Sequence, residues 1–120
     1  QVIAVRRDTR DKAAIQIADI AKEIPVLLEA IQSDLFTAAK AMAAENTAIV
    51  DDYATLVERV AENAGWNLAH WCGDPECEAK VKTETKATTR CIPFDQPDEQ
   101  GACIVCGRPS DGRVIFARAY

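Results

Sequence analysis

The chain has a single histidine, His70, and this scarcity excludes most familiar catalytic arrangements. Histidine changes its charge near neutral pH more readily than other side chains, so it serves most often as a general base. The sequence shows no serine-histidine-aspartate set, no pair of carboxylates in a catalytic pattern and no glycine-rich phosphate loop. We therefore expect no independent active site within these 120 residues.

Long hydrophobic runs and an excess of basic residues are absent as well. No apolar stretch is long enough to cross a bilayer, and no signal peptide is visible. Acidic residues outnumber basic ones by 19 to 14, so the composition lacks the positive charge of a typical nucleic-acid-binding domain. We expect no membrane partner, and we expect any RNA contact to be local. The length and the 48% hydrophobic content fit one moderate core.

The five cysteines form the most informative pattern, because four of them fall in two close pairs. Cys72 and Cys77 make one pair, and Cys103 and Cys106 make a Cys-x-x-Cys pair that precedes a glycine. Together they supply the four thiolates of a tetrahedral zinc site. Four thiolates leave no position for water, so we predict that the zinc ion is structural. An odd cysteine count with tight pairs favours a reducing compartment, which we take to be the cytoplasm.

Other roles for these side chains remain open. A disulfide pair is the next interpretation, and a redox-active Cys103-x-x-Cys106 pair is a weaker one, because that motif normally opens a helix. His70 is an alternative ligand for one position of the metal site. Cys91 lies in a predicted strand, where a small buried core residue is the simplest interpretation.

The first part of the chain reads as a strand or hairpin followed by a long helix. Residues 2–7 form an apolar strand, whereas residues 13–17 fit either a second strand or the start of a helix. From residue 19 to about 44, apolar residues at alternating spacings of three and four predict a helix that packs on a core. Pro25 would begin a new helix or kink a longer one.

Capping residues mark two further helices. A helix over residues 52–63 is predicted, with Asp51 as its N-cap and Gly65 in the left-handed position that closes it. After a strand at residues 66–71, the dipeptide Asp74-Pro75 begins the third helix, since aspartate caps well and proline suits the first position.

The remaining segments complete a small sheet. We predict strands at residues 88–94 and 113–119, separated by a polar loop and by a tight turn at residues 103–107. The predicted fold class is α+β. An N-terminal strand and a helical connector precede a small mixed-sheet α/β module that a four-cysteine zinc site cross-links.

Three residues outside the cysteine pairs are candidate contacts. Arg6 and Arg7 follow the first strand, where they could bind phosphate or a base edge of RNA, although a solvated strand end is the simpler interpretation. Tyr120 ends the chain directly after a strand, so its side chain and carboxylate could dock into a neighbouring domain.

The cysteine motifs and their flanks resemble a known family. The similarity is to the C-terminal region of prolyl-tRNA synthetase of the archaeal- or eukaryote-like type. Residues 1–12, with Val5–Thr9 among them, resemble the closing strand of its anticodon-binding domain. The segments that carry the resemblance to the zinc-binding domain are Trp71–Lys80, Ala87–Gln96, Cys103–Gly107 and Arg113–Tyr120.

The resemblance implies a class II, homodimeric parent enzyme that activates proline with ATP and Mg²⁺ and esterifies tRNA(Pro). It implies that residues 1–18 end the anticodon-binding domain, residues 19–65 form a helical connector and residues 66–120 form the zinc-binding domain. This region would then contact the catalytic and anticodon-binding domains, with the Tyr120 carboxylate near the active site. The class II signature motifs are absent, so we expect this chain alone not to aminoacylate tRNA.

Two other functions compete with this interpretation. One is a free-standing RNA-binding module cross-linked by zinc, and the other is a thiol redox protein. One zinc ion per chain without a disulfide would exclude the redox protein. Salt-dependent binding of tRNA by the isolated chain would favour the RNA-binding module.

Overall fold

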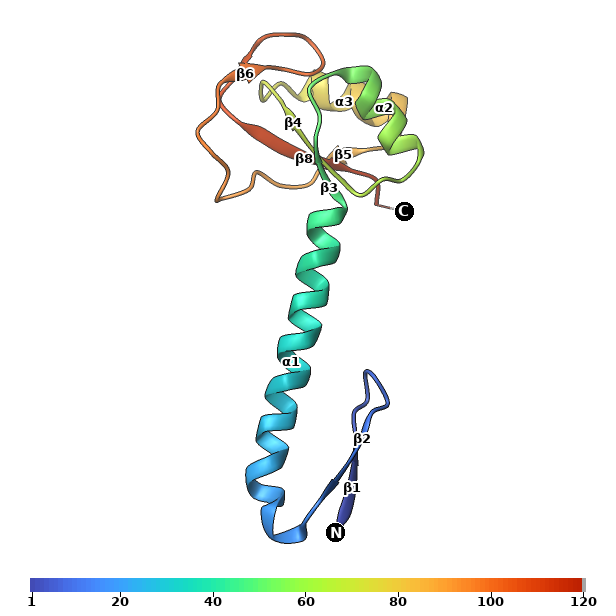
Figure 1. Cartoon of the computed structure of the whole chain (residues 1–120). Helices are drawn as coiled ribbons and strands as arrows, with labels where there is room; N and C mark the ends of the chain where they lie inside the picture. The colour runs from blue at the N-terminus through green and yellow to red at the C-terminus, as the bar shows by residue number, and fades with distance from the viewer. Residues whose placement is uncertain (120) are drawn as a thin grey trace. The chain divides into compact units, whose positions relative to one another are not determined.

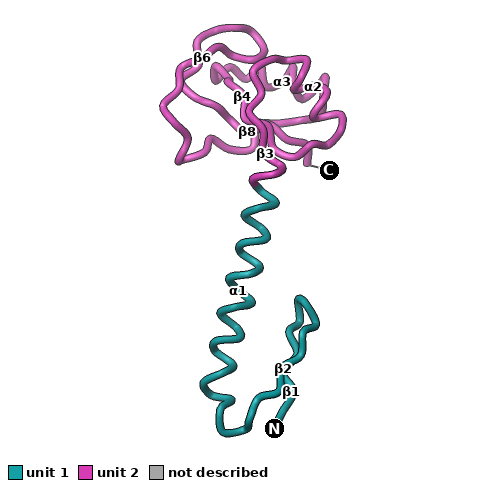
Figure 2. Tube along the Cα trace, viewed as in Figure 1, with its two compact units in different colours: residues 1–43 teal, residues 44–120 magenta. Residues whose placement is uncertain are grey.

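The computed structural model describes residues 1–119, and it divides the chain into two compact units (Figures 1 and 2). Unit 1 comprises Gln1–Ala43 and unit 2 comprises Ala44–Tyr120, of which Tyr120 lies outside the described residues. Within the described part, no helix is both long enough and apolar enough to span a membrane. The predicted ranges 1–18, 19–65 and 66–120 stay predictions.

Unit 1 begins with an antiparallel hairpin. Strand β1 (Val2–Val5) pairs with strand β2 (Lys12–Ile15), so that Val2 lies opposite Ile15. A 3-10 turn (Ile17–Asp19) then leads into the long helix. The two alternatives for residues 13–17 are thus resolved: the strand ends at Ile15, and helical backbone begins two residues later.

Helix α1 (Ile20–Glu45) confirms the predicted long helix, but its packing differs from the prediction. Pro25 lies inside this helix and does not begin a separate one. The predicted apolar stripe is largely exposed, with Leu28, Leu35 and Met42 each more than half accessible. The helix contains no buried residue, so the expected packing on a core does not occur among the described residues.

Unit 2 is built on a four-stranded mixed sheet with the order β3-β4-β8-β5. Strand β3 pairs in parallel with β4, whereas β8 pairs antiparallel with both β4 and β5. These strands are β3 (Thr47–Ile49), β4 (Trp66–His70), β5 (Thr88–Thr89) and β8 (Arg113–Ala117). The sheet confirms the predicted α+β class, although the three-residue strand β3 was not predicted.

The two helices of unit 2 begin at aspartate caps. Helix α2 (Tyr53–Ala61) is capped by Asp52, which accepts a hydrogen bond of 2.8 Å from the amide of Thr55. The prediction of Asp51 as the cap is therefore wrong by one residue, because Asp51 instead forms an ion pair elsewhere in unit 2. Helix α3 (Pro75–Thr85) begins as predicted, with Asp74 accepting a hydrogen bond from the amide of Glu76.

The core of unit 2 forms where α2 and α3 pack on the sheet. Phe116 on β8 and Leu56 on α2 are fully inaccessible, and Val81 contributes from α3. Burial of such side chains supplies most of the stabilisation of a small domain. The complete buried cluster is Val50, Leu56, Val60, Ala69, Val81, Ala87, Val114 and Phe116.

The segment between β5 and β8 departs most from the prediction. Strand β5 ends at Thr89, so the predicted strand over residues 88–94 is too long, and β8 ends at Ala117. A small hairpin of β6 (Gly101–Ala102) and β7 (Pro109–Ser110) was missed. Cys91 is exposed, so its prediction as a buried core residue is wrong. Its carbonyl still accepts a hydrogen bond from Ile115, but its side chain lies on the surface.

Candidate metal centre

Four cysteine sulfurs converge at one point of unit 2. Their Sγ atoms all lie within 4.8 Å of one another, although the residues come from two distant segments. Cys72 Sγ is 3.8 Å from Cys77 Sγ and 3.6 Å from Cys106 Sγ. Cys103 completes the group. The predicted convergence of the two pairs is therefore confirmed.

The sulfur separations suit a shared tetrahedral ion. A zinc-sulfur bond of about 2.3 Å places the ligands of a tetrahedral site about 3.8 Å apart. A disulfide would require an S–S distance of about 2.05 Å. All five cysteines are free thiols, so neither pair is a disulfide in this structure. A donor set of four sulfurs is typical of zinc or of iron in an all-cysteine site.

The first pair is positioned by the turn between β4 and α3. Gly73 has a φ of +82°, a left-handed conformation that glycine adopts without a steric penalty. Asp74 and Pro75 then start α3, which places Cys77 in the first helical turn. The indole of Trp71 donates a hydrogen bond of 3.0 Å to the carbonyl of Asp74 and so fixes the turn. Cys77 therefore lies at the positive end of the helix dipole, which favours negative charge on its sulfur.

The second pair lies in the turn between β6 and β7. The amide of Cys103 donates to the carbonyl of Arg108 at 2.7 Å, and the amide of Gly107 donates to the carbonyl of Cys103 at 2.8 Å. Gly107 has a φ of +75°, which this turn requires. The amide of Ile104 also donates to the carbonyl of His70 at 2.9 Å, so the turn is attached to the end of β4.

The four thiols differ in burial and in acidity. Burial first, and then hydrogen bonding to the thiols of Cys106 and Cys72, raises the pKa of Cys77 to about 12. At Cys72 the amide of Asp74 lowers the pKa, but burial and hydrogen bonding to the thiols of Cys103 and Cys106 outweigh it, so the pKa of Cys72 is raised. The guanidinium of Arg108 lowers the pKa of the exposed Cys106 to about 6. A divalent cation would favour the thiolate form of the whole group.

Arg108 contacts both halves of the cluster. Its Nε atom donates a hydrogen bond of 3.3 Å to Cys106 Sγ, and its Nη2 atom pairs with the carboxylate of Asp74. The prediction from sequence missed Arg108, because nothing in the spacing of the cysteines shows which cation lies beside them. Its position directly after Cys106-Gly107 is the one signal that the sequence offered.

His70 does not belong to the sulfur cluster. Ser110 donates its hydroxyl proton to the carbonyl of Gly112, so its oxygen accepts from His70 Nδ1 at 3.1 Å. His70 Nε2 lies 3.8 Å from a carboxylate oxygen of Glu99. The proposal of His70 as a substitute ligand is therefore not supported by its position, because both ring nitrogens face other partners.

This serine-histidine-glutamate contact is not a nucleophilic arrangement. Ser110 is buried, and its proton is directed to Gly112 and not to the imidazole. The carboxylate of Glu99 is bound by Arg113, which donates from Nε and Nη2 at 3.0 Å each. The guanidinium of Arg113 also holds the pKa of Glu99 below its ordinary value. We interpret the group as a structural network between β4, β8 and the loop over residues 90–100.

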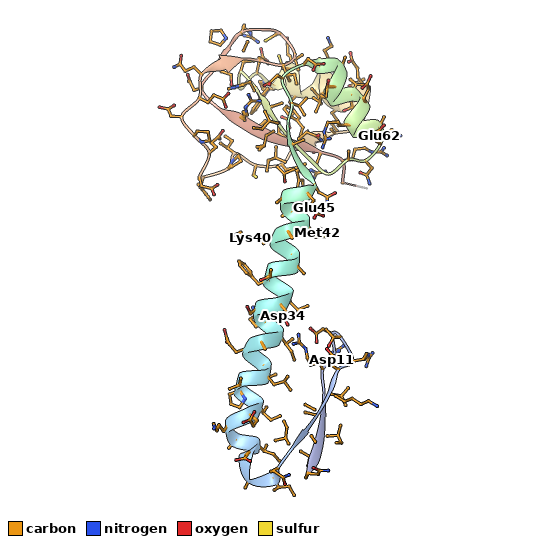
Figure 3. All side chains as sticks on the ribbon, viewed as in Figure 1. Asp11, Asp34, Lys40, Met42, Glu45 and Glu62 are labelled. Carbon is orange, nitrogen blue, oxygen red and sulfur yellow. The ribbon has the colours of Figure 1, made fainter. Side chains whose placement is uncertain are left out.

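The two predicted RNA contacts differ in their surroundings. Arg6 Nη2 pairs with Asp8 at 2.7 Å and with Asp34 of α1 at 2.8 Å, within unit 1. Figure 3 shows Asp34 on α1 beside the hairpin turn that carries Asp11. Arg7 is exposed. Contact with tRNA stays a prediction for both arginines, and the prediction for Tyr120 lies outside the described residues.

The fold and the site define a class of protein: a small α+β domain that brings together four thiols from two distant segments. The family described as "Prolyl-tRNA synthetase, C-terminal" matches residues 53–120. The chain therefore belongs to this family, as the sequence motifs predicted.

Curated relatives and solved structures extend the match over nearly the whole chain. A proline–tRNA ligase of Cytophaga hutchinsonii is 48% identical over 115 residues, which are 96% of this chain and 23% of the relative. One of Lachnospira eligens is 38% identical over 100% of this chain and 25% of the relative. The crystal structure of prolyl-tRNA synthetase from Cryptosporidium parvum complexed with L-proline and AMP covers 98% of this chain and 25% of that chain, at a TM-score of 0.87 and 31% identity. This chain thus spans about a quarter of the length of these relatives.

Proposed function

We propose that this chain forms the C-terminal, metal-holding region of a proline–tRNA ligase that attaches proline to tRNA(Pro). The parent enzyme would use ATP and Mg²⁺, act as a homodimer and work in the cytoplasm. The observation that supports this most directly is the convergence of four sulfurs in a domain of this family. The catalytic chemistry would belong to other parts of the enzyme.

Zinc is the ion that we propose for the cluster. Cys72, Cys77, Cys103 and Cys106 would hold it as thiolates, and four sulfur ligands leave no coordination position for a substrate or a reactive water. A bound zinc ion would supply structural cross-linking and no catalysis. The chain's own contribution is to place the start of α3 beside the β6–β7 turn.

We propose that the segments of the chain take the places that the family resemblance implies. Residues 1–18 would end the anticodon-binding domain, residues 19–65 would form a helical connector, and residues 66–120 would form the zinc-binding domain. The exposed apolar side chains of β1 and α1 are consistent with packing against further parts of a longer enzyme.

Aminoacylation by the full-length enzyme tests this function. We expect the complete protein to charge tRNA(Pro) with proline and to carry one zinc ion per chain, measured by elemental analysis. Substitution of Cys103 by serine should reduce the zinc content and the yield of folded enzyme together. A complete protein that charges another amino acid, or that carries iron in place of zinc, would contradict the corresponding part of the proposal.

Docking of the chain terminus is tested separately. We propose that the Tyr120 carboxylate lies near the active site of the parent enzyme. Deletion of Tyr120 should impair proline activation and aminoacylation while the zinc content and the unfolding temperature stay unchanged. Unaltered kinetics in the deletion variant would remove the docking role without affecting the metal site.

An RNA-binding role of unit 1 is tested through its arginines. In the full-length enzyme, alanine at Arg7 should weaken tRNA binding and reduce the salt dependence of the binding constant. Arg6 is held by Asp8 and Asp34, so its substitution should affect the hairpin as well as the RNA. Strong, salt-dependent tRNA binding by the isolated chain would favour the free-standing RNA-binding module instead.

A further inference from the structure

The cation beside the sulfur cluster connects its two halves. Arg108 Nε donates to Cys106 Sγ at 3.3 Å, and Arg108 Nη2 forms an ion pair with Asp74 Oδ2. The other carboxylate oxygen of Asp74 accepts the amide of Glu76 at 2.8 Å and so caps α3, whose first turn carries Cys77. One side chain therefore spans from a thiol of the second pair to the helix start of the first pair.

No other cationic side chain in residues 1–119 has a hydrogen bond to one of the four sulfurs. This makes the position of Arg108 specific to the cluster and not part of a general basic surface. Because the guanidinium offers donors in a fixed planar fork, it can bind a sulfur and a carboxylate at the same time. A lysine at this position has a single ammonium group and holds both partners less well.

We propose that Arg108, through its pair with Asp74, is a positioning residue for the metal centre, and this inference rests on the proposed metal-binding function. It holds Cys106 near the start of α3 before a metal ion enters. It also offsets negative charge, because four thiolates and one divalent cation leave a formal charge of −2 at the site.

The solvent exposure of Cys106 and of Arg108 sets the size of the expected effect on metal affinity. Cys106 is the exposed member of the cluster beside the buried Cys77 and Cys103, so it is the sulfur most accessible to chelators and electrophiles. A hydrogen bond from a cation withdraws electron density from that sulfur and lowers its nucleophilicity. Partners of this kind typically change metal affinity by 10- to 100-fold. The Arg108 side chain is 58% exposed and solvent screens its charge, so we expect the lower end of this range.

The test uses the complete chain loaded with one equivalent of zinc. Zinc affinity is measured by competition with a chromophoric chelator, and zinc release is timed in excess chelator. The alkylation rate of each cysteine by iodoacetamide in the loaded protein is read by peptide mass mapping. Arg108→Ala should weaken zinc binding about tenfold, speed release by a similar factor and raise alkylation at Cys106 more than at Cys72.

Two further variants separate positioning from simple destabilisation. Asp74→Asn keeps a good helix cap but removes the ion pair, and Arg108→Lys keeps the charge but not the fork, so both should fall between the wild type and Arg108→Ala. Lys82→Ala is the matched control, since Lys82 is an exposed cation on α3, and it should change none of the three measurements. A merely structural loss would raise alkylation of all four cysteines together and would leave the ratio of Cys106 to Cys72 alkylation close to its wild-type value.

The outcomes distinguish this inference from the function on which it rests. A wild-type chain that binds no metal overturns both. The second outcome is that the wild type binds one zinc ion per chain and Arg108→Ala has the same zinc affinity, zinc release rate and Cys106 alkylation rate. That result overturns only the role of Arg108. If Arg108→Ala fails to fold, Arg108→Lys and Asp74→Asn decide the question. Wild-type zinc affinity, release and Cys106 alkylation in both variants would overturn the role of Arg108.

Discussion

Cys72 Sγ lies 3.6 Å from Cys106 Sγ, although 34 positions separate the two residues in the chain. The contact brings together the two ends of the segment over residues 72–106, which contains α3, β5 and the loop before β6. The hydrophobic cluster of unit 2 holds α3 and β8 together but includes neither residue. The flanking residues Trp71, Ile104 and Val105 pack against that cluster. The sulfur cluster is therefore an additional connection beside the core of a small domain, where cross-links matter most.

Substitution of a cluster cysteine should destabilise unit 2 strongly. In Cys103→Ser we expect loss of the bound metal and a decrease in the free energy of unfolding on the order of 4 kcal/mol or more, because metal binding is coupled to folding. Elemental analysis and thermal unfolding of the chain measure the two effects. Cys91→Ser is the matched control, since Cys91 is exposed and lies outside the cluster. Full metal content and full stability in Cys103→Ser would show that the cluster does not bind the metal.

Alanine should be tolerated very differently at two glycines with left-handed backbone. At Gly65, with a φ of +71°, an added Cβ would lie 2.2 Å from the carbonyl oxygen of Asn46. At Gly73, with a φ of +82°, nothing lies within 4 Å of the added Cβ. We expect Gly73→Ala to cost about 1–2 kcal/mol for the backbone conformation alone. Gly65→Ala should cost about 3 kcal/mol or more in denaturant unfolding. An equal decrease in the free energy of unfolding for Gly65→Ala and Gly73→Ala would refute the steric argument.

Arg113 is a buried charged residue, and we expect its substitution to destabilise unit 2 strongly. Its side chain is 10% exposed and donates to Glu99, to Asp51 and to the carbonyl of Leu68. Arg113→Ala should lower the free energy of unfolding by about 3 kcal/mol, because it removes several hydrogen bonds and the packing of a long side chain. Arg90→Ala, which removes one hydrogen bond to Ala117, serves as the control and should cost about 1 kcal/mol. A loss at Arg113 no larger than at Arg90 would contradict the network that we describe.

Tyr53 should titrate above the ordinary range of tyrosine. Its hydroxyl donates to Glu84 at 2.5 Å, and burial together with this carboxylate raises the pKa of Tyr53 to about 12. A raised pKa means that the folded state holds the proton more tightly, so this stabilisation is complete below pH 10 and is lost as the pH rises toward 12. In a Tyr120→Phe background, tyrosinate absorbance reports Tyr53 alone. A midpoint near pH 10 would disprove the shift, and Glu84→Gln should move the midpoint downward.

Several features of the site could be predicted from the sequence because they depend on near neighbours. The two cysteine pairs, the cap at Asp74 and the proline that starts α3 are local patterns. The choice between Asp51 and Asp52 as the cap of α2 could not be made, because both are acceptable caps. In the folded chain Asp52 accepts the hydrogen bond from Thr55, and Asp51 is bound by Arg113, which lies 62 positions further along the chain.

The four-cysteine donor set, the position of most elements and the family resemblance could all be predicted from the amino-acid sequence, because each is encoded in short patterns or in residue identity. The folded structure was needed to show that Arg108 contacts the cluster, that Cys91 is exposed, that β3 exists and that β5 is short. These features depend on burial and hydrogen bonding between segments far apart in the chain. The same holds for the apolar stripe of α1, whose periodicity predicts a helix but does not reveal which surface covers it.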